Sequence, residues 1–218
     1  MVRAQNRNEI DPPSEGAEKI SKWPRTNRRL ERIESVLRRR QTSLTVVLED
    51  VHDPHNASAV LRSCDAVGVL DVHLVYVQEE FPRKSFGRST SASAAKWIRI
   101  HEHNSIEECY HHLRGQRFRI AATALEPESS DLYELDFTSP TALVFGNEMR
   151  GVSAGGIRGA DCTVCIPMQG MVESLNISVS CAVALYEAMR QRQRAGMYDR
   201  AELGPDELAR VRDEWLRK

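Results

Sequence analysis

The feature that most constrains the fold is an alternation of short apolar segments with amphipathic ones. Apolar runs of strand length, separated by segments with helical periodicity, occupy residues 44–51, 72–77, 119–125, 141–146 and 162–168. Buried parallel strands have this nearly continuous apolar character, and the helices between them supply the crossovers. The sequence therefore predicts an α/β fold, a mostly parallel sheet flanked by helices.

Helical periodicity and composition divide the chain into four parts. Residues 1–26 carry Pro, Gly, Asn and mixed charge without an apolar period, which predicts a flexible tail. Residues 27–43 contain a basic helix, expected over 27–40, whose arginines surround a narrow apolar stripe. Residues 44–195 are expected to form the main domain, with helices at 57–67, 105–113 and 175–194. Residues 196–218 form a helical extension, with a helix expected from Pro205 to Arg217.

The charge of the chain points to anionic partners without deciding between them. The net charge is only -1, but 25 of the 30 basic residues are arginine, the side chain best suited to phosphate contacts. Charge alone leaves RNA binding and solvated helix faces equally open. No apolar stretch reaches the length of a membrane span, and the N-terminus lacks the apolar run of a signal peptide. A cytoplasmic protein without a membrane partner is expected.

Metal ions and nucleotide cofactors are not expected. The five cysteines are odd in number and lie mostly in apolar runs, so no disulfide framework is predicted. Cys162 and Cys165 form a CxxC, but an offset of three along a strand places them on opposite faces. His52 and His55 have no third ligand nearby. The Gly-rich motifs that bind NAD, FAD or ATP are absent from the sequence.

Three segments depart from what packing requires and predict a composite site. Residues 56–68, 142–153 and 166–187 each join an apolar run to a loop rich in Asn, Arg, Glu, Ser and Gly. Loops at the carboxyl ends of parallel strands meet at one edge of the sheet, where ligands bind. We therefore expect these three segments to lie together.

Each candidate residue also has a purely structural interpretation. Asn56 is expected at a helix cap or in the loop before it, and it fits capping as well as chemistry. Arg62 is flanked by Leu61 and Cys64, which predicts a half-buried side chain, and a half-buried guanidinium requires an anion. Gly146 at a strand end permits close ligand approach and Glu148 can accept from a ligand, although a turn with a solvated carboxylate is equally common. Ser174 is either a helix cap or, with its neighbour at position 176, part of a polar ligand site.

In this order, the three segments resemble the motifs of the SpoU/TrmH branch of the SPOUT class of RNA methyltransferases. The resemblance extends over about residues 29–200. The motif residues of the family fall on Asn56, Arg62, Gly146, Glu148, Ser174 and Asn176. The segment 186–198 resembles the corresponding part of the members that modify tRNA.

The resemblance implies a fold, a methyl donor and a reaction. It implies a C-terminal trefoil knot, an exception to the rule that chains avoid knots, and a homodimer. The methyl donor S-adenosylmethionine would be bound around Thr123, Gly146, Ile166, Met168 and Leu175. The expected reaction is methylation of a ribose 2'-hydroxyl in tRNA, with the D-loop guanosine at position 18 as the target. The alternatives are methylation of ribosomal RNA and a non-catalytic RNA-binding knotted protein.

The resemblance also assigns roles to arginines. In the family, the residue at Arg62 is the proposed proton acceptor, although a guanidinium has a pKa above about 12. We expect it at least to bind the substrate phosphate and to stabilise the developing alkoxide, and base catalysis remains open. Both ends of the domain are expected to contact tRNA, and no DNA, through Arg28, Arg29, Arg32, Arg190, Arg192 and Arg194.

Overall fold

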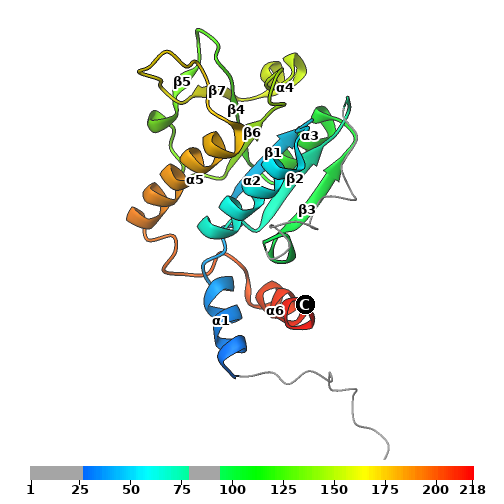
Figure 1. Ribbon diagram of the computed structural model, residues 1–218. Coiled ribbons are helices and arrows are strands. Elements are labelled where there is room, and N and C mark those ends of the chain that lie inside the picture. The colour runs from blue at the N-terminus through cyan, green and yellow to red at the C-terminus, as the bar shows by residue number, and fades with distance from the viewer. Residues whose placement is uncertain (1–26, 79–93) are drawn as a thin grey trace, which may run out of the picture.

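The computed structural model describes residues 27–78 and 94–218, which contain a seven-stranded sheet (Figure 1). The strand order is β3-β2-β1-β6-β4-β7-β5, and every neighbouring pair is parallel. The strands are β1 (Leu44–Glu49), β2 (Asp71–Val75), β3 (Arg99–His103), β4 (Arg119–Thr123), β5 (Ser130–Asp131), β6 (Thr141–Phe145) and β7 (Cys162–Cys165). This arrangement confirms the predicted α/β class with a mostly parallel sheet.

Helices cover both faces of the sheet and form a separate cluster beside it (Figure 1). The helices are α1 (Asn27–Leu37), α2 (Pro54–Val67), α3 (Ile106–Gly115), α4 (Ala154–Gly159), α5 (Ile177–Arg194) and α6 (Pro205–Arg217), with short 3-10 turns at Ala95–Trp97 and Leu132–Glu134. Helices α2 and α5 pack together on one face, and α3 and α4 pack on the other. Helices α1 and α6 contact each other, so the predicted N- and C-terminal segments share one small core.

The side-chain alternation of β1 explains how one strand serves two cores. Val46 and Leu48 belong to the core under α2 and α5, whereas Val47 belongs to the core under α3. Successive side chains of a strand point to opposite faces, so a central strand covered on both sides must be apolar throughout. All six residues of β1 are buried. This burial produces the continuous apolar run that makes the strand visible in the sequence.

The predicted elements exist with altered bounds. The five predicted strands end earlier than expected, because the residues after each strand turn into loops. Strands β3 and β5 were not predicted, since β3 is a polar edge segment and β5 has two residues. The first helix ends at Leu37 rather than at position 40, and the helix at 205–217 was predicted correctly.

Arg40, which was expected on the exposed side of the first helix, is fully buried. Its guanidinium donates to the carbonyl of Val69 at 2.8 Å and pairs with Asp65. It also lies 5.0 Å from the ring centroid of Trp215 in α6. A buried arginine requires such partners, and Arg40 therefore connects the terminal helices to the main sheet.

The flexible tail, the trefoil knot and the division into four parts stay predictions. The predicted flexible tail at 1–26 lies outside the described residues. The trefoil knot and the division into four parts stay predictions, because strand order alone does not establish them. Among residues 27–78 and 94–218, no helix combines the length and apolar character needed to cross a membrane.

Candidate active site

Three residues from the three predicted segments form one hydrogen-bonded chain at the carboxyl edge of the sheet. Asn56 Nδ2 in α2 donates to Glu148 Oε1 at 2.8 Å. Asn176 Nδ2, at the start of α5, donates to Asn56 Oδ1 at 3.1 Å. Asn56 and Asn176 are 120 positions apart in the sequence, so only the fold brings them together. The prediction that the three segments lie together is therefore confirmed.

Glu148 is the acceptor at the end of this hydrogen-bonded chain. Its carboxylate also accepts from the backbone N–H of His52 at 3.0 Å and of Asp53 at 3.2 Å. Partial burial raises the pKa of Glu148, but the hydrogen bonds from Asn56, His52 and Asp53 outweigh it and leave the pKa below its ordinary value. The carboxylate is therefore a weak base, suited to holding the start of α2 in place.

The helix caps decide between the structural and chemical interpretations of three residues. Asp53, not Asn56, is the N-cap of α2, and its carboxylate accepts from the N–H of His55. Asn56 lies within the first turn, which leaves its side chain free to join Glu148. Asn176, not Ser174, is the N-cap of α5, and its Oδ1 accepts from the N–H of Ser178 at 2.9 Å. Asn176 thus caps a helix with its oxygen and contacts the site with its nitrogen.

The loop that carries Glu148 is shaped by a residue that the sequence analysis missed. Asn147 is buried, and its Nδ2 donates to the carbonyl of Asp50 at 2.8 Å. Its Oδ1 accepts from the N–H of Met149 at 2.9 Å and of Arg150 at 3.1 Å. An Asn that follows a strand-terminal glycine is a common turn former, and this was the available signal.

Gly146 is required by the loop itself. A Cβ at this position would lie 2.1 Å from backbone atoms of Gly151 and Val152. The close approach arises because Asn147 and Gly151 exchange backbone hydrogen bonds of 3.0 and 2.8 Å. Space for a ligand was the expected reason for this glycine. The structure adds a second reason, since a side chain at this position would collide with the backbone of Gly151 and Val152.

A pocket of about 630 Å³ lies next to the hydrogen-bonded chain. It is lined by all five residues expected to hold the methyl donor, Thr123, Gly146, Ile166, Met168 and Leu175. Leu132, Val164 and Ile177 add apolar surface, and Glu148 and Ser174 add polar groups. Such a mixed lining fits a ligand with a flat apolar part and polar ends. An adenosyl group linked to an amino acid has this character.

Arg62 lies apart from this pocket. It is in the third turn of α2 and is exposed, whereas the sequence analysis expected it to be half buried. It does not line the pocket, and neither does Asn56. The geometry of a single copy of the protein therefore does not by itself assign a chemical role to Arg62.

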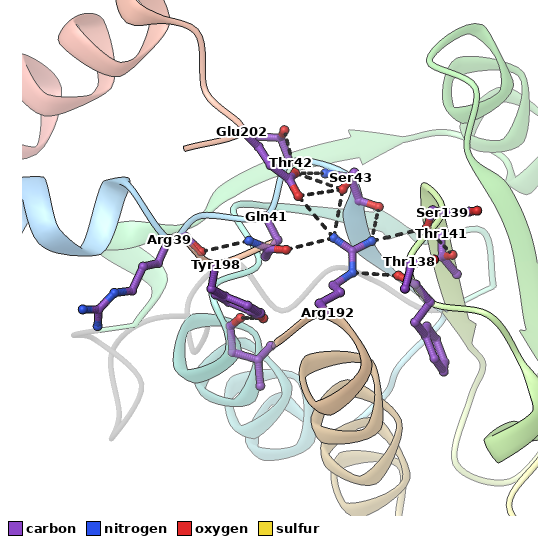
Figure 2. A network of polar contacts seen from close by, with 12 residues as sticks. Arg39, Gln41, Thr42, Ser43, Thr138, Ser139, Thr141, Arg192, Tyr198 and Glu202 are labelled. Atoms are coloured by element: carbon purple, nitrogen blue, oxygen red, sulfur yellow. Dashed lines mark hydrogen bonds and ion pairs between the residues drawn. The ribbon is translucent and has the colours of Figure 1, made fainter. Parts of the chain in front are cut away.

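Arg192 is a structural residue, and its predicted contact with RNA is wrong. The side chain is fully buried. As Figure 2 shows, the guanidinium reaches from the end of α5 to the segments that lead into β1 and β6. Its nitrogens donate to the carbonyls of Phe137 at 2.9 Å and Ser43 at 2.8 Å, to Gln41 Oε1 at 3.1 Å, and lie 3.5 Å from the Glu202 carboxylate. No donor remains for a phosphate.

The other predicted RNA-binding arginines are accessible. Arg28, Arg29 and Arg32 are exposed on α1. Arg190 and Arg194 are exposed near the end of α5, where Arg190 makes a two-point contact with Glu187 at 2.6 and 2.7 Å. The sequence pattern could not separate Arg192 from its neighbours, because a basic residue near a helix end is usually solvated.

Comparisons with known proteins agree with the geometry. A model of the SpoU rRNA methylase family matches residues 43–186. A tRNA (guanosine(18)-2'-O)-methyltransferase of Thermus thermophilus is 48% identical over 194 residues, which cover 89% of this chain and 98% of the relative. The matched region contains every residue of the hydrogen-bonded chain and of the pocket described above.

Solved structures show the same relationship. The tRNA modifying enzyme TrmH/SpoU of A. aeolicus superimposes with a TM-score of 0.77 and 37% identity, covering 86% of this chain and 94% of that one. The SpoU methyltransferase AviRb of Streptomyces viridochromogenes, solved with its cofactor AdoMet, gives a TM-score of 0.62 and 30% identity over 71% of this chain and 62% of the other.

Proposed function

The chain belongs to the SpoU rRNA methylase family, and from that premise we propose that it methylates a ribose 2'-hydroxyl of tRNA, at the D-loop guanosine of position 18. The observation that carries the proposal is the chain Asn176–Asn56–Glu148 at the edge of a pocket lined by the expected donor residues. A protein that only bound RNA would have no need of this pocket. The hydrogen-bonded residues and the pocket together indicate the enzyme class, whereas neither feature alone would.

The donor is S-adenosylmethionine, which supplies a methyl group activated by a positively charged sulfur. Thr123, Ile166, Met168 and Leu175 would hold it within the pocket. The ionised carboxylate of Glu148 also lines the pocket and favours a cationic ligand there. The apolar lining and the carboxylates of Glu126, Glu148 and Glu173 thus fit a cationic donor with an apolar part.

The reaction forms a carbon–oxygen bond at the ribose, breaks the carbon–sulfur bond of the donor, and releases the hydroxyl proton. The protein has to hold the 2'-oxygen in line with the methyl group and to stabilise the charge that develops on this oxygen. Glu148 is a positioning residue in this scheme, because its oxygens already accept from Asn56, His52 and Asp53. Ser174 and Asn176 present polar groups at the pocket rim, where the ribose would enter.

Arg62 is assigned to the substrate phosphate and the developing alkoxide, with base catalysis still open. Its exposure agrees with a residue that awaits a large ligand. Arginine suits this role because its planar fork matches two phosphate oxygens. Its distance from the pocket within one copy is explained if a second copy completes the site.

A homodimer is supported by exposed apolar side chains near the pocket. Val179 and Tyr186 lie seven positions apart on α5, which places them on one helix face, and they are 46% and 50% exposed. Met171, in the loop that leads to α5, is fully exposed. Apolar patches of this kind mark association surfaces. Light scattering of the purified protein should give twice the mass of the chain, and a monomer mass would exclude the dimer.

The experiment that tests the function compares the parent protein with Arg62→Ala in transfer of labelled methyl groups to tRNA. We expect the variant to lose methyl transfer and to retain donor binding, because Arg62 does not line the pocket. Arg62→Lys should not restore activity, since an ammonium lacks the planar fork. Ribosomal RNA serves as the second substrate. Labelling of ribosomal RNA alone would select the alternative target, and equal turnover by parent and Arg62→Ala would remove Arg62 from the mechanism.

A further inference from the structure

Four histidines gather at the edge of the sheet formed by β2 and β3, far along the strand order from the donor pocket. His73 lies in β2, His101 and His103 lie in β3, and His112 lies in α3, which packs over this edge. The ring centroids of His101, His103 and His112 are 4.8, 5.2 and 5.5 Å from that of His73. None of these residues has a part in the proposed reaction.

Two of the rings and a cysteine converge on one point. His73 Nδ1 lies 2.9 Å from His103 Nε2. Cys109 of α3 is fully buried, and the ligand atoms of His73, His103 and Cys109 all lie within 4.8 Å of one another. Within the part of the chain that the structure describes, this is the group of His, Cys, Asp and Glu side chains with metal-ligand spacing. The sequence analysis looked for ligands at neighbouring positions and missed it.

We propose that His73, His103 and Cys109 bind a zinc-class transition metal ion, with His112 as the fourth ligand. Zinc in proteins lies about 2.0–2.1 Å from histidine nitrogen and about 2.3 Å from cysteine sulfur, in a tetrahedron. Ligand atoms of such a site are about 3.3–3.7 Å apart, a consequence of those bond lengths. The ligand atoms of His73, His103 and Cys109 lie within 4.8 Å of one another, so side-chain rotations would bring these three to the required geometry. His112, whose ring centroid is 5.5 Å from that of His73, would turn toward them to complete the tetrahedron.

The surroundings support a cation at this place. A second pocket, of about 440 Å³, is lined by His73, His101 and His112 and gives an entry path. His101 Nε2 is 2.7 Å from Asp71 Oδ1, so His101 is committed to a carboxylate and supports the site from outside. Glu108 interacts electrostatically with His103. These carboxylates offset the positive charge that remains after one thiolate has bound a divalent ion.

The donor set selects the class of metal. Imidazole and thiolate favour zinc and its neighbours in the transition series, whereas magnesium and calcium require oxygen ligands. On binding, the metal–sulfur bond forms and the thiol proton passes to solvent, with no change of oxidation state. The bound ion would fasten α3 to the β2–β3 edge, which is a structural role. It would therefore raise stability without entering the methyl transfer.

The test is a titration of the full-length protein with Co²⁺, after removal of metals by a chelator. We expect one equivalent to bind with a sulfur-to-cobalt charge-transfer absorption, which Zn²⁺ then displaces. Cys109→Ser should abolish the absorption. The double variant Cys162→Ser/Cys165→Ser, which removes the CxxC of β7, should keep it. Absence of the absorption in the parent protein, or its loss only in the CxxC variant, would overturn the proposal.

A second variant separates loss of the metal site from loss of the fold, because replacing the buried Cys109 can itself destabilise the protein. His103 is only partly buried, so His103→Gln should fold normally, which circular dichroism and unchanged methyl transfer would verify. We expect its affinity for Co²⁺ to fall at least tenfold and Zn²⁺ to stop raising its melting temperature. Parental affinity in a folded His103→Gln variant would contradict the assignment of this ligand and of the site.

Discussion

At the scale of single residues, the site depends on side chains that each perform two tasks. Asn176 caps α5 through Oδ1 and contacts Asn56 through Nδ2. Asn56 accepts from Asn176 and donates to Glu148. An amide side chain can donate and accept at the same time because it has an NH₂ group and a carbonyl oxygen, whereas an ionised carboxylate can only accept. The chain therefore has a fixed direction, from Asn176 to the carboxylate.

Glu148→Gln should reverse part of this polarity. One carboxylate oxygen becomes an NH₂ group, which cannot accept. The side chain therefore loses either the hydrogen bond from the His52 N–H, which Oε2 accepts, or those from Asn56 and the Asp53 N–H, which Oε1 accepts. Hydrogen bonds to a charged group contribute about 1.5–3 kcal/mol each, so we expect kcat/KM for tRNA to fall about tenfold to 100-fold. Steady-state kinetics will measure it. Glu126→Gln, which changes another carboxylate lining the pocket, is the control, and equal losses in both variants would contradict a specific role for Glu148.

The lowered pKa of Glu148 predicts a pH dependence. A carboxylate whose folded pKa is depressed is ionised above that value, and its contribution is lost as the pH falls through it. Burial alone would raise this pKa, and the hydrogen bond from Asn56 is the largest of the lowering effects. Removing it in Asn56→Ala should therefore shift the acid limb of the kcat/KM profile to higher pH. Coincident acid limbs for the parent and Asn56→Ala would show that Glu148 does not set this limb.

At the scale of elements, Arg192 joins the end of α5 to the segments entering two central strands, β1 and β6 (Figure 2). Burial lowers the pKa of this guanidinium, and the Glu202 carboxylate opposes that shift. The arginine remains charged because a guanidinium is not deprotonated in proteins. Arg192 thus fixes α5, and with it the cap Asn176, relative to the sheet.

Arg192→Ala should destabilise the protein strongly. It removes the arginine donor from the carbonyl of Phe137 and the ion-pair partner of Glu202, whereas the carbonyl of Ser43 keeps the N–H of Thr141 as a donor. Breaking a buried pair on one side costs about 3–5 kcal/mol. Urea unfolding followed by circular dichroism will measure the loss. Arg194→Ala, two positions along the same helix and exposed, should change the free energy of unfolding by less than about 0.5 kcal/mol. Similar values for the two variants would mean that the buried contacts of Arg192 add nothing.

Helix α1 should act as a tRNA contact. Charge reversal of Arg28, Arg29 and Arg32 to Glu should weaken tRNA binding and flatten its salt dependence, because each lost phosphate contact lowers the slope by about 0.7 to 0.9. Donor affinity should not change. Filter binding over a range of salt concentrations will measure the tRNA affinity and its salt dependence. If the variant kept the parental affinity and slope, these arginines would be solvated and the tRNA surface would lie elsewhere.

At the scale of the whole molecule, the sequence predicted the elements in which buried residues follow a regular period. Strands covered on both faces, such as β1, and the amphipathic helix α6 carry periodic patterns that local reasoning can read. The edge strand β3 does not, because its histidines stack on His73 of β2 rather than packing in an apolar core. The histidine cluster around β3 could therefore not be predicted from the sequence.

The same distinction applies to the site. Asn56, Glu148 and Asn176 were found because their residue types are unusual at strand ends and match a family pattern. The buried state of Arg192 was not predictable, since its partners lie up to 151 positions away. The collision that excludes a side chain at Gly146 was not predictable either, because it comes from the later residue Gly151. Contacts across long sequence separations need the fold itself.

The central claim is that this molecule methylates the ribose of one tRNA nucleotide, and it has a direct test. The purified protein is incubated with labelled S-adenosylmethionine and two synthetic tRNAs that differ only in the 2'-hydroxyl of guanosine 18. The account predicts one methyl group per tRNA at that 2'-oxygen and no labelling of the tRNA that carries 2'-deoxyguanosine there. Equal labelling of both tRNAs, or labelling of neither, would contradict it.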